Sequence, residues 1–421
     1  MTSKSIYVGY TITDKSPIYL SNKMRTGHVQ IIGATGRGKT ASVVLPWFIR
    51  DFKSENTPIL VDGKGDEEIL WKLKEKLPPS EFEKIAVFNL SDQVMSLNPL
   101  LDGTPTEIAD RLISSLEFES EYFKSIQHAA VLLVVQTLKA TGHEVSIPLL
   151  CDYLVYPQKL LELVKSERTF PQDLLLEITK LCQMNKDSRE ERLSGIVSQL
   201  KPFCDADLRE QFFNHDEDKE IDLIKLLTNP LDSKYKACVI LLNTLQFQKT
   251  AKVFGKMVLQ LLAWITAKRK MDAHFCPILI DEFSAFVFDG FEQFLNKARS
   301  KNIALHLSHQ SLGDLENVST SFAKTVNVNT NIKVLLGLND PDTADYMARH
   351  LGTKTKQKST ERATKNNWGD VEALGELSLR EVEQYKIHPN RLKNYANGMG
   401  VISLLVDGYP LIEEVQFERS T

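Results

Sequence analysis

Short runs of apolar, β-favouring residues recur along this chain, separated by stretches with helical spacing. The runs lie at residues 28–32, 58–62, 84–90, 237–242, 277–281, 303–308, 332–338 and 400–406. Each run is apolar at nearly every position, as expected of strands that are buried on both faces. The pattern therefore predicts an α/β protein, in which a mostly parallel sheet carries helices on both faces.

The pattern changes between the third and the fourth run. From residue 104 to about residue 229 there is no convincing strand, whereas several segments repeat apolar residues at helical spacing. The sequence Thr104-Pro105-Thr106-Glu107 is typical of a capping box with proline at the first helical position. We therefore predict an all-α domain at 104–229, inserted into an α/β domain that comprises residues 1–103 and 230–421.

Charge narrows the possible partners only slightly. The formal net charge of −4 over 421 residues gives no overall attraction to nucleic acid or anionic lipid, so any contact with a polyanion must be local. One segment, 354–370, has five Lys or Arg residues against two acids and almost no apolar side chains. We expect a mobile, solvated loop there, with a polyanion-binding loop as the alternative.

Cysteine usage and apolar run lengths indicate a cytoplasmic protein. The five cysteines are scattered and form no Cys-x-x-Cys pair, so we expect neither a disulfide framework nor a zinc cluster. The N-terminal residues lack the apolar core of a secretory signal. The longest apolar runs fall well short of the roughly 18–20 residues that cross a bilayer, so we expect no transmembrane segment.

The clearest functional motif is a Gly-rich loop between the first predicted strand and a helix start. It matches the pattern Gly-x-x-x-x-Gly-Lys-Thr and consists of Gly33, Ala34, Thr35, Gly36, Arg37, Gly38, Lys39 and Thr40. In such a P-loop, backbone N–H groups surround the phosphates, the lysine reaches the β- and γ-phosphates, and the hydroxyl binds Mg²⁺. The motif predicts a site for ATP and Mg²⁺, with Lys39 on the phosphates and Thr40 on the metal.

A P-loop site also needs an acid on a neighbouring strand, and the run at 277–281 supplies one. Asp281 ends this run and Glu282 follows it. We expect Asp281 to be the carboxylate on the metal side and Glu282 to be the general base that activates the attacking water. Gln310 follows the next predicted strand, and we expect it to sense the γ-phosphate.

Other polar residues at strand ends are harder to assign. Asp62 ends a predicted strand and Lys64 lies between two glycines, where a structural turn and a place beside the active site are both open. We interpret His306 and His309 as structural residues, the first packed within the fold and the second hydrogen-bonded at a strand end.

Together these features resemble the cytosolic ATPase domain of type IV secretion coupling proteins, the TraD/TraG family of conjugation motors. The resemblance rests on the all-α insertion and on GATGRGKT, VDGKGD, FNLSDQVMSLNPL, LIDEFSAF, KARSKNIALHLSHQ and LGLNDPDTADYMARHLG. It implies a RecA-like fold, a homo-hexameric ring with ATP at subunit interfaces, and DNA, expected to be single-stranded, in a central channel. By similarity, Arg299 would be the arginine finger that reaches a neighbour's γ-phosphate.

The resemblance also implies partners. The all-α domain would bind relaxosome or other adaptor proteins, and secretion-channel proteins would hold the motor at the inner face of the membrane. Family members usually carry transmembrane helices before the P-loop, whereas 32 residues precede Gly33 here, so the mode of membrane attachment stays open. Two alternative functions also stay open: a HerA/FtsK-like DNA translocase or other secretion ATPase, and a nucleotide-gated scaffold that recruits protein substrates.

Overall fold

The computed structural model describes residues 4–65, 67–92, 95–165, 167, 169–213, 216–365, 371–406 and 408–418, with the backbone alone at 217, 358–365 and 371–380. Its centre is an 11-stranded sheet. The parallel part runs in the order β9 (Ile332–Leu335), β3 (Val29–Ile32), β8 (Ile303–His309), β7 (Cys276–Asp281), β4 (Ile59–Asp62), β6 (Ala237–Leu241) and β5 (Ile85–Asn89). Every run that the sequence predicts as a strand forms one, and the mostly parallel sheet is confirmed.

An antiparallel extension continues the sheet beyond β9. It adds β12 (Met399–Val406), β13 (Tyr409–Phe417), β1 (Ser5–Thr11) and β2 (Pro17–Ser21) in that order. Only β12 was among the predicted strands. Each of the other three contains exposed or half-buried positions, so they lack the continuous apolar run that a strand buried on both faces shows.

Helices cover both faces of the sheet. On one face, α2 (Leu45–Lys53) and α3 (Glu67–Lys76) share an apolar core with Val29, Ile31 and Leu279. On the other face, the core contains α13 (Gln248–Lys268), α14 (Phe291–Ala298) and α16 (Thr320–Asn329). The remaining helices of this part are α1 (Asn22–Arg25), α4 (Pro79–Phe82), α15 (Leu312–Glu316), α17 (Pro341–Leu351) and α18 (Pro389–Lys393).

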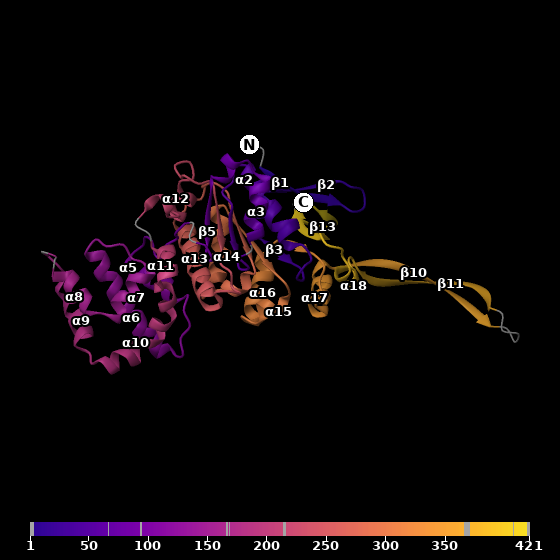
Figure 1. Cartoon of the computed structure of the whole chain (residues 1–421). Helices are drawn as coiled ribbons and strands as arrows, with labels where there is room; N and C mark the ends of the chain where they lie inside the picture. Colours follow the sequence, from indigo (N-terminus) through magenta and orange to yellow (C-terminus); the bar gives the residue numbers. More distant parts are fainter. Residues whose placement is uncertain are drawn as a thin grey trace.

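All elements between β5 and β6 in the described residues are helical. They are α5 (Pro105–Ile113), α6 (Glu121–Ala140), α7 (Ile147–Val155), α8 (Gln158–Lys165), α9 (Gln172–Gln183), α10 (Lys186–Leu200), α11 (Ala206–Phe212) and α12 (Leu223–Thr228), with short 3₁₀ turns at Lys201–Cys204 and Glu217–Lys219. The expected capping box starts α5, because the Thr104 hydroxyl accepts from the Glu107 N–H and the Glu107 carboxylate accepts from the Thr104 N–H. Figure 1 shows these helices gathered at one end of the molecule.

A cluster of aromatic rings joins this helical part to the sheet. Phe254 of α13 stacks on Phe88 of β5 and meets Phe212 of α11, with ring centroids 4.9 Å apart in both pairs. Phe203 contacts Phe212 in turn at 4.8 Å. Because all four rings are fully buried, the helices and the sheet share one continuous apolar core. No helix in the described part of the chain is long and apolar enough to cross a membrane.

Residues 353–385 correct the interpretation of 354–370 as a mobile, solvated loop. Strands β10 (Thr353–Lys365) and β11 (Val371–Tyr385) form a long antiparallel hairpin, and residues 366–370 lie outside the described residues. The hairpin extends from the body on the side away from the helical part (Figure 1). Its two strands pair only with each other. The residues of β10 are nearly all polar, so this sequence offers no apolar alternation that would distinguish a strand from a loop.

Candidate functional site

The P-loop leaves β3 and leads into one turn of π-helix, Thr40–Val44, which continues as α2. Gly36 and Gly38 have φ angles of 76° and 89°, in the left-handed region that favours glycine. A Cβ atom at Gly38 would also lie 3.0 Å from the Ser42 hydroxyl and 3.4 Å from the Gly398 nitrogen. The loop therefore curls tightly, and the C-terminal part of the chain packs directly against it.

Two P-loop side chains point inward. Lys39 is 5% exposed, and its Nζ donates to the Gly33 carbonyl at 2.7 Å. Burial lowers the pKa of Lys39, while the nearby Asp281 carboxylate opposes that change. The Thr40 hydroxyl donates to Asp281 Oδ2 at 2.6 Å, so the P-loop is joined directly to the end of β7.

Asp281 is fully buried, and hydrogen bonds to both of its carboxylate oxygens fix its orientation. Its second oxygen, Oδ1, accepts a hydrogen bond from Ser308 on the adjacent strand β8 at 2.6 Å. Sequence reasoning missed Ser308. The available signal was a small polar residue within the apolar run IALHLSH, which has meaning only once β7 and β8 are known to be neighbours.

Glu282 follows β7 with a φ of 57°, a left-handed conformation that is uncommon for a residue with a side chain. Burial raises the pKa of Glu282, and the ammonium of Lys64 opposes that change. Lys64 Nζ lies 4.0 Å from both Asp281 Oδ2 and Glu282 Oε1. The structure thus places Lys64 beside the two acids. Asp62 holds the turn that carries Lys64, since its Oδ2 accepts from the Gly65 N–H at 2.7 Å.

Gln310 and Arg37 lie on other sides of the loop. Gln310 is the first residue after β8, and its Oε1 accepts a hydrogen bond from the P-loop residue Thr35 at 2.8 Å. Arg37 instead points toward the C-terminal part, where its guanidinium donates to the Tyr395 carbonyl at 3.4 Å and to Asn339 at 3.2 Å. Gln310 therefore contacts the P-loop through Thr35, whereas the Arg37 side chain contacts the C-terminal part.

Arg299 lies far from the other predicted site residues of its own chain. It is exposed and begins the short 3₁₀ turn Arg299–Lys301, just before β8 starts. Gln310 follows the far end of the same strand. Because β8 has seven residues, the two positions are separated by about 20 Å. Arg299 therefore lies near the N-terminal end of β8, whereas the P-loop lies at the opposite end of the parallel strands.

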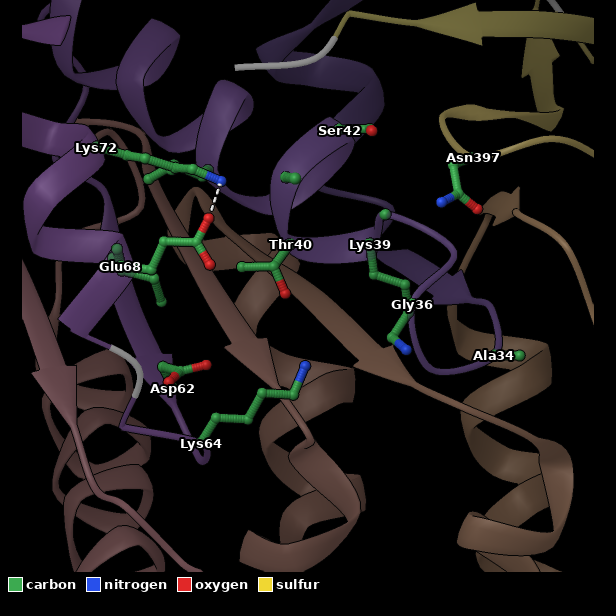
Figure 2. A pocket seen from close by; sticks show the side chains of 14 residues that line it. Ala34, Gly36, Lys39, Thr40, Ser42, Asp62, Lys64, Glu68, Lys72 and Asn397 are labelled. Atoms are coloured by element: carbon green, nitrogen blue, oxygen red, sulfur yellow. Dashed lines mark ion pairs between the residues drawn. The ribbon is translucent and has the colours of Figure 1, made fainter. Parts of the chain in front are cut away.

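A cavity of about 380 Å³ opens beside the P-loop, a volume in the usual range of ligand sites. Figure 2 shows Thr40, Lys64 and Asp62 around it, with Asn397 on the far side. Its lining consists of Ala34, Gly36, Gly38, Lys39, Thr40, Ala41, Ser42, Leu45, Asp62, Lys64, Glu68, Ile69, Lys72 and Asn397. Sequence reasoning missed Asn397 and the Glu68–Lys72 ion pair of 2.5 Å, because nothing local distinguishes them from ordinary surface residues.

These residues fit a nucleotide with a divalent metal. The glycine conformations, the buried lysine and the Thr40 hydroxyl provide phosphate and metal ligands at one wall of the cavity, and Asp281 is hydrogen-bonded to Thr40. In the part of the chain that the structure describes, no cluster of three or more His, Cys, Asp or Glu side chains could hold a metal alone. A metal here would therefore need phosphate and water oxygens as well, which is how Mg²⁺ is usually bound beside nucleotides.

Comparisons with known proteins agree with this geometry. Residues 276–393 match the family described as the TraM recognition site of TraD and TraG. The structure is similar to the bacterial conjugative coupling protein TrwB in an unbound form, with a TM-score of 0.66 and 15% identity, over 99% of this chain and 90% of that one. A search of curated proteins gives no match.

Two further solved structures share the fold. One is TrwB in complex with ADP and Mg²⁺, with a TM-score of 0.65 and 16% identity, over 98% of this chain and 89% of that one. The other is VirB4 of Thermoanaerobacter pseudethanolicus, with a TM-score of 0.62 and 14% identity, over 99% and 96%. This chain thus has the RecA-like fold of a conjugative coupling protein and contains a TraD/TraG family segment, which confirms the resemblance seen in its motifs.

Proposed function

We propose that this protein is an ATP-driven motor that delivers DNA, alone or with bound protein, to a type IV secretion or conjugation channel. The observation that carries the proposal is the 2.6 Å hydrogen bond between Thr40 and Asp281, with Glu282 beside it. This bond joins a P-loop to an acidic strand end within the fold that TrwB shares. The match of residues 276–393 to a TraD and TraG segment supports the same function.

Each of these side chains has a separate role in ATP hydrolysis. Lys39 and the backbone of Gly33–Thr40 hold the phosphates, and Thr40 with Asp281 would hold Mg²⁺. When bound, Mg²⁺ neutralises charge on the phosphates. Glu282 accepts the proton of the attacking water, and its raised pKa makes it a stronger base than an ordinary glutamate. Gln310, held against Thr35, would contact the terminal phosphate.

Arg299 acts on a neighbouring subunit. It is exposed and about 20 Å from the strand end that leads to Gln310, so it cannot complete the site of its own chain. This placement supports a homo-hexameric ring with ATP at each interface and DNA in the central channel. We propose that adaptor proteins of the relaxosome bind the helical domain at 104–229 and the segment at 276–393, and that channel proteins hold the ring at the membrane.

A second candidate is an ATPase that energises the secretion channel without choosing the substrate. The similarity to VirB4, which extends over 96% of that chain, favours it. The two candidates differ in their response to DNA, because only a motor that acts on DNA should hydrolyse ATP faster when DNA is present.

The test is the ATPase rate per subunit, measured across protein concentration with and without single-stranded DNA. A motor predicts a rate that rises as rings form and rises again with DNA. Lys39→Ala is the control that removes phosphate binding and should abolish both effects. A concentration-dependent rate without DNA stimulation would favour the channel-energising ATPase. A slow ATPase rate that depends on neither protein concentration nor DNA would favour a nucleotide-gated scaffold and would contradict the motor function.

A further inference from the structure

A lysine lies buried in the sheet next to the P-loop strand. Lys333 on β9 is 2% exposed, and burial lowers its pKa to about 7. Its Nζ donates to Gln30 Oε1 at 2.8 Å, to the Asn327 carbonyl at 2.7 Å and to the Thr330 hydroxyl. Each of these partners is uncharged. Because burying an ammonium is costly, a lysine held only by neutral acceptors calls for a specific reason.

The lysine fixes how the Gln30 amide is turned. Gln30 lies on β3 directly opposite Lys333, and its Oε1 accepts from both Lys333 and Thr330. Its Nε2 group therefore faces His309 Nε2, 3.0 Å away. An amide NH₂ group can only donate, so His309 Nε2 must accept and the imidazole proton must lie on Nδ1. Turning the amide over would place its NH₂ group against Lys333 Nζ and remove the oxygen to which Nζ donates.

The histidine then fixes the backbone beside Gln310. His309 Nδ1 lies 2.7 Å from the Ser311 carbonyl and, in this tautomer, donates to it. Asp314 Oδ2 accepts from the N–H groups of Gln310 and Ser311 at 2.8 and 3.1 Å. The backbone on both sides of Gln310 is thus held, and the Gln310 side chain meets Thr35 of the P-loop.

We propose that Lys333 is a positioning residue for Gln310: its Nζ group sets the Gln30 amide, the amide sets the His309 tautomer, and the histidine anchors the turn that presents Gln310 to the P-loop. The inference rests on the proposed function for what Gln310 contacts. The hydrogen-bond chain itself does not depend on that function. Lys333 lies on the sheet face covered by α16, so it touches neither the cavity nor Glu282.

The decisive experiment is a double-mutant cycle between Lys333→Met and Gln310→Ala. Lys333→Met alone should lower kcat about tenfold with KM for ATP nearly unchanged, because a loosened Gln310 costs turnover rather than binding. In the Gln310→Ala background the same change should have no further effect on kcat. Val334→Ala is the matched control. Val334 is the next residue on β9, buried on the opposite face, so its effect on kcat should be the same in both backgrounds.

A second readout needs no hydrolysis. In ¹⁵N-histidine NMR spectra, His309 should show the proton on Nδ1 in the wild-type protein and a mixture of tautomers after Lys333→Met. Equal kcat losses for Lys333→Met in both backgrounds, or an unchanged His309 tautomer, would overturn the proposal. If the wild-type protein hydrolysed no ATP, the proposed function would fail, and the NMR spectra would still decide whether Lys333 sets the tautomer.

Discussion

The buried Lys333 should make the stability of this protein depend on pH in the alkaline range. Its pKa is about 7 in the folded protein and 10.5 is its ordinary value, so the unfolded chain binds the proton more tightly than the folded protein does. Well below pH 7 both states carry the proton, and well above 10.5 neither does. Between these values the unfolded state binds more protons, so the contribution of Lys333 to the free energy of unfolding rises with pH.

The size of the effect follows from the two pKa values. Their difference of about 3.5, at about 1.4 kcal/mol for each pH unit, amounts to about 5 kcal/mol over the whole window. Between pH 7 and 9 the expected gain is about 2 to 3 kcal/mol relative to a variant without the lysine. Lys333 interacts electrostatically with His309 and His350, and burial lowers the pKa of both, so neither should change charge in this range.

Urea unfolding of the wild-type protein and of Lys333→Met at pH 7, 8 and 9 measures this gain. The difference in unfolding free energy between them should change steadily in favour of the wild-type protein as the pH rises. Substitution of the exposed Lys297 by methionine is the control and should leave the pH dependence unchanged. Parallel curves for the wild-type protein and Lys333→Met would show that Lys333 is not the titrating group, and the reasoning would be refuted.

Three further predictions concern the proposed function. Glu282→Gln should bind ATP normally but lower kcat at least a hundredfold, measured by nucleotide titration and single-turnover hydrolysis, because the amide cannot accept the proton of water. Arg299→Ala and Lys39→Ala should each be inactive, yet mixed rings should regain activity, because some interfaces then combine an intact lysine with an intact arginine. No gain on mixing would show that Arg299 does not act across an interface. Lys354→Glu with Lys356→Glu should weaken binding of single-stranded DNA and flatten its salt dependence in fluorescence titrations, since both lysines are exposed on one face of the hairpin. Unaltered binding would exclude the hairpin as a DNA contact.

The sequence predicts those parts of the fold whose signals are local. Parallel strands are apolar throughout because they are buried on both faces, and the P-loop is recognisable because its glycines and lysine are consecutive. Asp281 and Glu282 are recognisable because they follow such a strand. In each case the physical cause lies within a few residues of the signal.

The contacts that complete the site depend on which strands are neighbours, and one sequence does not reveal that. Ser308 meets Asp281 only because β8 lies beside β7, and Lys333 meets Gln30 only because β9 lies beside β3. Asn397 reaches the cavity from a loop near the C-terminus with no motif of its own. The strand β10 was missed for another reason, since its residues are nearly all polar and leave no apolar alternation to detect.

The position of the C-terminal strands sets when the nucleotide site can form during synthesis. The P-loop precedes these residues by about 300 positions or more, yet the Gly337 carbonyl holds its Ala34 N–H, Gly398 packs against Gly38, and β13 pairs with β1. A growing chain therefore carries the complete phosphate-binding sequence long before it can close the loop around a nucleotide. Newly made subunits should stay unable to bind ATP until β13 has been synthesised and has paired with β1, so no subunit lacking these strands would compete for a place in the ring.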